Sequence, residues 1–217
     1  RRGTLHEFRA LEQVKNIRDP HLVPVVAYWL LDESGQVIAD PASALWASGG
    51  SAPASAAALP SGRPRAVTLI IAMGLGSKSL FERLEECVAE GHSGIPWKEL
   101  LEDAARGIDF LNRPSQQHES IIHGDIKPHN ILIVGNAAQV CDFGLARAVD
   151  SIRATNMPVG TVAYAAPELL QSRPLHRNTD QYCLAVSYVE LRTGALPFDA
   201  ETVVGICEKH VKGQLDL

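Results

Sequence analysis

Residues 123–142 carry four side chains whose types and spacing suit phosphoryl transfer. Asp125 is followed by a cation at Lys127, an amide at Asn130 and a second acid at Asp142. Phosphoryl transfer needs positioning and charge neutralisation more than covalent chemistry, and these residue types supply both. Carboxylate and amide oxygens also suit Mg²⁺, a hard ion that prefers oxygen ligands. We therefore expect a phosphoryl-transfer site with a metal ion between Asn130 and Asp142.

A hairpin is expected to bring Asn130 and Asp142 together. Asn130 is followed by an apolar run at 131–134, then by a Gly-Asn turn signal, and residues 138–141 return as a second strand. Such a hairpin carries the chain back to the end where it began. Both side chains then lie at one end of the hairpin, where they can share one metal ion.

Three ordered motifs resemble those of eukaryotic-like (Hanks-type) Ser/Thr protein kinases, of the kind that bacteria also carry. The family motifs H-R-D-x-x-x-x-N, D-F-G and A-P-E correspond here to His123-Gly124-Asp125…Asn130, Asp142-Phe143-Gly144 and Ala166-Pro167-Glu168. The resemblance implies an α+β, bilobal kinase-like fold with a partial small β lobe and a truncated, mainly helical large lobe. It also implies transfer of the γ-phosphoryl group of ATP, with Mg²⁺, to a protein hydroxyl.

The resemblance assigns a role to each candidate site residue. Asp125 corresponds to the catalytic base, Lys127 to the lysine that neutralises the transferred phosphoryl group, and Thr161 to the threonine that hydrogen-bonds both. Lys127 also favours a Ser/Thr acceptor over tyrosine. Asn130 and Asp142 correspond to the ligands of Mg²⁺. The structural alternatives are turn-capping acids and amides, a solvated lysine and an ordinary loop threonine.

The resemblance places the nucleotide beside a hinge. Met73 corresponds to the gatekeeper behind the adenine, Leu75 lies in the Gly-Leu-Gly hinge, and Leu132 would form the apolar floor. A plain core role is the alternative for each of these apolar residues. Glu7 is the candidate for the helix glutamate that pairs with the phosphate-binding lysine, and Glu12 is the second choice. A capping box offers Glu7 a purely structural role.

Three residues outside the catalytic group are expected to support it. His123 should orient the catalytic loop from a packed position, and Asp180 should be the buried helix aspartate that holds the loop backbone. Glu168 resembles the glutamate that pairs with an arginine late in the large lobe.

The chain departs from the family pattern in places that leave other functions open. The Gly-rich phosphate loop, the strand lysine and the last helices are not found in residues 1–217, so we expect truncation at both ends. Gly124 replaces the arginine of H-R-D, as in small-molecule phosphotransferases of the aminoglycoside and choline kinase type. The D-F-G and A-P-E motifs favour a protein substrate instead. A pseudokinase scaffold is a further alternative, which the four intact site residues count against.

The remaining elements follow from apolar periodicity and turn signals. We expect the small lobe at 1–76, with a low-complexity insertion at 41–64, and the large lobe at 77–217. The expected helices are at 4–18, 79–90, after Pro96, at 178–193 and at about 199–212, and the expected strands are at 22–31 and 66–73. Residues 145–163 are expected to be a loop.

Composition narrows the class of protein. The chain has 217 residues, 46% hydrophobic and 21% charged, which is ordinary for a globular protein. Its net charge of −5 argues against nucleic-acid binding. The four cysteines form no Cys-x-x-Cys pair, which favours reduced thiols in a cytoplasmic protein. No apolar run reaches the roughly 18 residues that a membrane span needs, so no membrane segment is expected.

Overall fold

The structure is a computed structural model that describes residues 17–38, 68–91, 94–114, 120–142 and 159–216. The expected helix at 4–18 lies almost wholly outside the described residues, with both glutamate candidates, Glu7 and Glu12. The insertion expected at 41–64 lies outside them too.

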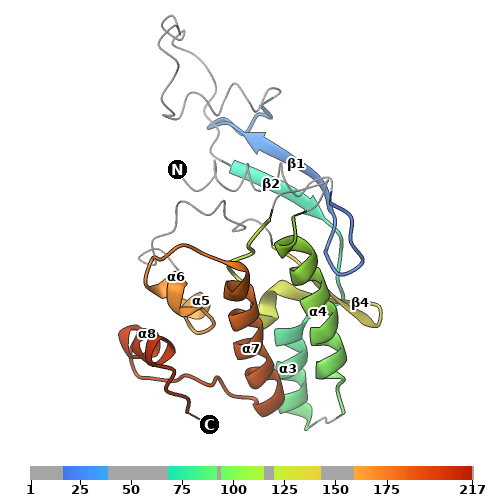
Figure 1. Cartoon of the computed structure of the whole chain (residues 1–217). Helices are drawn as coiled ribbons and strands as arrows, with labels where there is room; N and C mark the ends of the chain where they lie inside the picture. The colour runs from blue at the N-terminus through green and yellow to red at the C-terminus, as the bar shows by residue number, and fades with distance from the viewer. Residues whose placement is uncertain (1–16, 39–67, 92–93, 115–119, 143–158, 217) are drawn as a thin grey trace, which may run out of the picture.

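A two-stranded antiparallel sheet forms one part of the molecule (Figure 1). Strand β1 is Val25–Leu31 and strand β2 is Thr68–Met73, so both expected strands are present. Leu30 lies opposite Leu69 in the register and is buried with Ile38 on one face of the pair. Successive side chains point to opposite faces of a strand, and the β-branched and aromatic residues here suit a pleated, half-buried surface.

Three long helices form the core of the second part. They are α3 (Leu80–Glu90), α4 (Trp97–Asn112) and α7 (Arg177–Thr193), close to the ranges expected from sequence. Leu80, Ala104 and Leu111 are fully buried among them. The helices begin and end where sequence signals require it. Ser79 and Glu82 form a capping box at the start of α3, and left-handed glycines end α3 and α7.

A second antiparallel sheet carries the predicted hairpin. Strands β3 (Lys78–Ser79), β4 (Ile131–Val134) and β5 (Ala137–Val140) pair in the order β3-β4-β5. The turn between β4 and β5 has Gly135 at φ 63°, a left-handed conformation that favours glycine. A single turn of 3-10 helix, η1 (Pro128–Asn130), leads into β4. The hairpin predicted from the sequence is therefore confirmed.

The short helices depart from expectation in two places. Residues expected to be loop form the helical turn α5 (Val159–Val162). Helix α6 (Pro167–Leu170) begins at the proline of the A-P-E motif, a usual first helical residue. The loop prediction was wrong for α5 because four residues are too few to show a helical period. Helix α8 (Val203–Lys212) begins later than the expected start near 199, because the Thr202 side chain accepts from the Gly205 amide and caps it there.

The segment before β1 is fixed to the helical part of the molecule. The Val140 amide donates to the His21 carbonyl, and the Val23 amide donates to the Val140 carbonyl, both at 2.9 Å. Leu22 is buried in the core that contains α4 and β5. Gly107 of α4 makes room for this segment, because a Cβ there would meet the His21 carbonyl oxygen at 2.7 Å.

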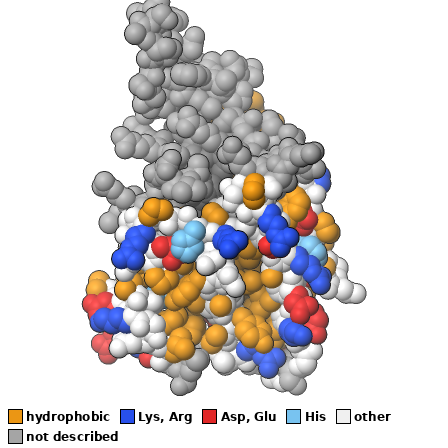
Figure 2. Space-filling model, viewed as in Figure 1, with side chains coloured by type: hydrophobic (Ala, Val, Ile, Leu, Met, Phe, Trp, Pro, Cys, Tyr) orange, Lys and Arg blue, Asp and Glu red, His pale blue; other side chains and the backbone are white. Residues whose placement is uncertain are grey.

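Hydrophobic side chains gather over the helices on the face shown in Figure 2, beneath a row of basic and histidine side chains. All four cysteines are free, and Cys87, Cys141 and Cys183 are buried. Burial raises the pKa of the Cys141 thiol to about 12. Within the described ranges, no helix is long and apolar enough to cross a membrane.

Replacing Gly107 with alanine tests the docking of residues 17–25 on α4. Overpacking against a backbone carbonyl costs about 1–3 kcal/mol, against the roughly 1 kcal/mol that alanine gains over glycine inside a helix. We expect a net loss of stability, seen as a lower midpoint of chemical denaturation. Gly160→Ala is the control, since a Cβ there meets nothing within 4 Å. A Gly107→Ala protein as stable as the wild type would contradict the docking.

Candidate active site

The Asp180 carboxylate holds the backbone of the catalytic loop. Asp180 lies in the first turn of α7 and is fully buried. Its Oδ2 accepts from the His123 amide at 2.9 Å, and its Oδ1 accepts from the Gly124 amide at 2.8 Å. Asn112, the last residue of α4, donates its side-chain amide to Oδ2 at 3.2 Å. The loop is therefore attached to two core helices at once, as expected for Asp180.

Gly124 adopts a conformation that favours glycine. Its φ is 73°, and a Cβ added there would meet only Leu175, at 3.7 Å. Space is therefore available for a side chain, but a non-glycine residue would carry the cost of the left-handed backbone. Both consecutive amides, at 123 and 124, can face the Asp180 carboxylate in this conformation.

His123 is a packed residue, as the sequence predicts. It is fully buried, and its Nε2 lies 2.9 Å from the Cys141 carbonyl oxygen. A carbonyl only accepts hydrogen bonds, so Nε2 must carry the proton in this contact. Nδ1 then accepts from the Asp125 amide at 3.3 Å. His123 thereby links the catalytic loop to the strand end that precedes Asp142.

Four of the predicted site residues form one hydrogen-bonded group. Lys127 Nζ donates to Asp125 Oδ2 and to Thr161 Oγ1, both at 3.0 Å. The Asn130 side-chain amide donates to the Asp125 carbonyl at 2.8 Å and to Asp125 Oδ2 at 3.0 Å. Asp125 is only 4% exposed. The structure thus brings together Asp125, Lys127, Asn130 and Thr161, including the predicted contact between Lys127 and Thr161.

The residues proposed to bind a metal offer suitable oxygen atoms. The Asn130 side-chain nitrogen donates hydrogen bonds to Asp125, so the Asn130 Oδ1 is the atom that can bind a cation. Asp142 is exposed and lies one residue beyond Cys141, whose amide donates to the Asn130 carbonyl at 2.9 Å. One carboxylate and one amide oxygen fit Mg²⁺, which commonly takes few protein ligands and completes its shell with phosphates and water. The described residues contain no cluster of three or more His, Cys, Asp or Glu side chains suited to a metal.

The predicted hinge lies against the predicted adenine floor. A Cβ on Gly76 would meet the Leu132 Cβ at 2.8 Å, so only glycine permits this approach. The Leu75 side chain is 93% exposed, and Met73 is 40% exposed. An exposed Leu75 side chain agrees with a contact made through its backbone. The Gly74 amide is already bonded to the Pro24 carbonyl at 2.9 Å.

Sequence reasoning missed three polar contacts made by Tyr164 and His210. The Tyr164 hydroxyl donates to Glu190 Oε2 at 2.7 Å, and burial raises the pKa of Glu190. His210 of α8 lies between the Ala163 carbonyl, at 3.1 Å from Nε2, and the Tyr182 hydroxyl, at 2.9 Å from Nδ1. Polar residues on otherwise apolar helix faces were the only available signal, and their partners are distant in sequence.

Glu168 has described partners other than the arginine expected from the resemblance. Its Oε1 accepts from the Thr179 hydroxyl at 2.5 Å and lies 3.5 Å from His176 Nε2. These contacts join α6 to the start of α7, next to Asp180.

An Asp180→Asn change should lower the stability of the fold by removing an acceptor from the catalytic-loop backbone. A carboxamide presents one oxygen and one NH₂ group to two backbone donors, so one buried N–H loses its acceptor, at a cost of about 1–3 kcal/mol. We expect that loss in the free energy of unfolding, measured by urea denaturation. Asp109→Asn on α4, whose side chain is 55% exposed, is the control and should change stability by less than about 0.5 kcal/mol. Equal stability of the two variants would contradict the anchoring role.

His210 should make stability depend on pH. Burial lowers its pKa from 6.5, so the unfolded chain binds a proton that the folded chain resists. The free energy of unfolding that the neutral His210 contributes is therefore fully present above about pH 6.5. It is lost as the pH falls through the lowered pKa of His210. We expect a steeper loss of the free energy of unfolding between pH 6.5 and 5 in the wild type than in His210→Gln. Parallel pH profiles for the two proteins would exclude this contribution.

Comparison with known proteins gives the same family as the motifs. The family model described as protein kinase domain matches residues 64–216, more than half of the chain. The serine/threonine-protein kinase PrkC of Bacillus subtilis is 44% identical over 98 residues, covering 43% of this chain and 15% of PrkC. PknF of Mycobacterium tuberculosis is 34% identical over 136 residues, covering 59% of this chain and 28% of PknF.

A third relative, PknB of Mycolicibacterium smegmatis, is 36% identical over 119 residues, covering 52% of this chain and 18% of PknB. The chain therefore spans less than a third of the length of each of these relatives. Because the family model matches most of the chain, and the fold combines helices with antiparallel sheets around the catalytic loop, the chain belongs to the protein kinase domain family.

Proposed function

We propose that this chain is the catalytic part of a protein Ser/Thr kinase that transfers the γ-phosphoryl group of ATP to a protein hydroxyl. The observation that carries the proposal is the group around Asp125, in which Lys127 contacts both Asp125 and Thr161 at 3.0 Å. The protein kinase family uses ATP and Mg²⁺ in general. The relatives described above are named as serine/threonine-protein kinases.

Asp125 is the catalytic base in this proposal. Lys127 and Asn130 both donate to its Oδ2, which fixes the orientation of the carboxylate. A carboxylate held in this way can accept the proton of an incoming hydroxyl. Lys127 would then neutralise charge on the transferred phosphoryl group, and Thr161 would hold Lys127 in place.

Asn130 and Asp142 are the proposed ligands of Mg²⁺, which when bound would bridge and neutralise the nucleotide phosphates. Leu132 and Met73 would border the adenine, and the backbone near Leu75 would hydrogen-bond to it. Glu7, outside the described residues, remains the candidate partner of a phosphate-binding lysine. We further propose the lobe division of the chain at residues 76 and 77.

A protein acceptor is preferred over a small molecule because of the segment after Thr161. Thr161 is followed closely by the A-P-E motif, which begins at residue 166. Residues 161–166 are all buried. Tyr164 and Ala163 are held by Glu190 and His210 from two different helices. In this proposal the anchored segment would support a peptide-binding ledge beside the acceptor, which a small alcohol does not need.

Asp125→Asn should lower phosphoryl transfer by about 10²–10⁴-fold, the usual contribution of a general base. Transfer of radiolabel from γ-labelled ATP to casein in the full-length protein measures this. The control is Asp199→Asn, an exposed position, which should keep full activity. Unchanged turnover in Asp125→Asn would overturn the role of Asp125. Transfer to an aminoglycoside, but not to casein, would instead favour a small-molecule phosphotransferase.

A further inference from the structure

A cavity lies between the starts of α3 and α4 and the β4–β5 hairpin. Its volume is about 510 Å³, within the range of about 300–1,000 Å³ typical of small-molecule sites. Its apolar lining comes from Ile95, Pro96, Leu100 and Ile133. Arg83 and Asn136 are the lining residues with polar side chains. Since adjacent strand residues face opposite ways, Ile133 turns to this cavity while Leu132 turns to the predicted nucleotide site.

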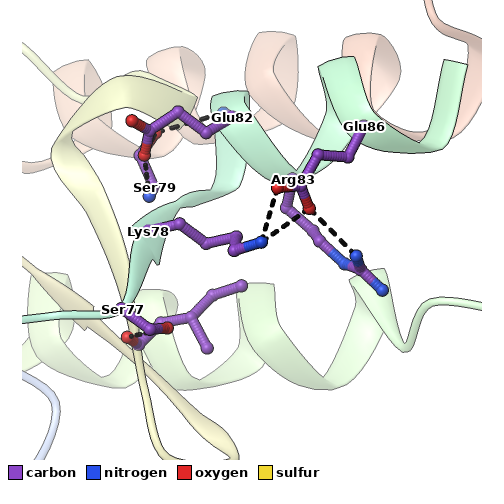
Figure 3. Close-up of polar contacts among 7 residues, drawn as sticks. Ser77, Lys78, Ser79, Glu82, Arg83 and Glu86 are labelled. Carbon is purple, nitrogen blue, oxygen red and sulfur yellow. Dashed lines mark hydrogen bonds and ion pairs between the residues drawn. The ribbon is translucent and has the colours of Figure 1, made fainter. Parts of the chain in front are cut away.

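Arg83 brings a cation to the cavity, and it shares its acidic partner with Lys78. Figure 3 shows Arg83 and Lys78 reaching the same carboxylate, that of Glu86, from two sides. Lys78 Nζ contacts both carboxylate oxygens, at 2.6 and 2.7 Å. Arg83 contacts only Oε2, through Nη1 at 3.0 Å. Two cations therefore share one carboxylate at the edge of the cavity.

Glu82, another acid in the first turn of α3, is engaged in the helix cap. Glu82 Oε2 accepts from the Ser79 amide at 2.6 Å and from the Ser79 hydroxyl at 3.0 Å, which caps α3. These hydrogen bonds lower the pKa of Glu82, so it stays ionised in its cap. Within the described part of the chain, Arg83 uses Nη1 alone, and an arginine has five N–H donors. The planar guanidinium is suited to a second carboxylate.

We propose that this cavity binds a small amphipathic carboxylate. Its carboxylate pairs with Arg83 and accepts from the Asn136 side-chain amide, and its apolar body packs against Ile95, Leu100 and Ile133. Lys78 continues to hold Glu86 when Arg83 turns to the ligand, because its two short contacts do not involve Arg83. The Arg83 side chain is 34% exposed and its ion pair with Glu86 is a surface pair, so exchanging partners costs little.

The size and lining of the cavity favour a free small molecule over a peptide. The lining comes from the starts of α3 and α4 and from the β4–β5 hairpin, which together make a short, open depression. A bound helix or strand would need a longer groove. An apolar lining with a small number of placed polar groups is the usual composition of a ligand pocket.

Binding is tested with sodium octanoate as the probe and octan-1-ol, of the same chain length, as the neutral comparison. Methyl NMR of the Ile and Leu residues in the intact chain follows the titration. We expect saturable shifts at Ile95, Leu100 and Ile133 with octanoate, with an affinity on the order of millimolar for a ligand of this size. Octan-1-ol should bind at least about ten-fold more weakly, because it lacks the charge-assisted hydrogen bonds.

Two arginine variants separate the cavity from general surface charge. Arg83→Met removes the cation but keeps an apolar stem, and should weaken octanoate binding about ten-fold or more. Arg106→Met is the matched control, since Arg106 also pairs with a carboxylate three residues away, at 3.3 Å, but does not line the cavity. It should leave binding unchanged. Equal binding of octanoate and octan-1-ol, or equal binding by the two variants, would overturn the proposal.

Discussion

The fully buried Asp180 carboxylate is the constraint on which the catalytic loop depends. Two consecutive backbone amides and the Asn112 side chain converge on it. A polar side chain in a protein core costs free energy unless such donors satisfy it. Because Asn112 ends α4 and Asp180 begins α7, the packing of these helices fixes where the loop starts. The positions of Asp125, Lys127 and Asn130 follow from that start, since they are only a few residues further along.

A second set of contacts fixes Thr161 and the segment that faces the catalytic loop. Lys127 reaches Thr161 across a sequence separation of 34 residues. Thr161 is in turn placed by Tyr164, whose amide donates to the Thr161 carbonyl at 3.2 Å and whose hydroxyl bonds to Glu190. Glu190 lies on α7, as Asp180 does. One helix therefore carries both the residue that holds the catalytic loop and the residue that holds the segment facing it.

Parts of this arrangement that are local in sequence could be predicted, and parts that depend on tertiary contacts could not. The hairpin from Asn130 to Asp142 was predictable because Gly135-Asn136 marks a turn between two apolar runs. The helical turn α5 was not, because four residues show no period and the surrounding contacts decide their conformation. The roles of Tyr164, His210 and Asn112 were also missed, since each depends on a partner on another element. The motifs indicated which residues would meet, but not what holds them there.

Strand β4 connects the catalytic group to the cavity beside α3. Its first residue follows Asn130, and its second and third residues, Leu132 and Ile133, face opposite ways. The Ser77 amide and hydroxyl both donate to the Ile133 carbonyl, at 2.8 and 3.0 Å, so the segment after the Gly76 hinge is bonded to the cavity wall. Leu132, the proposed floor of the adenine site, and Ile133, which lines the cavity, therefore lie on the same short strand.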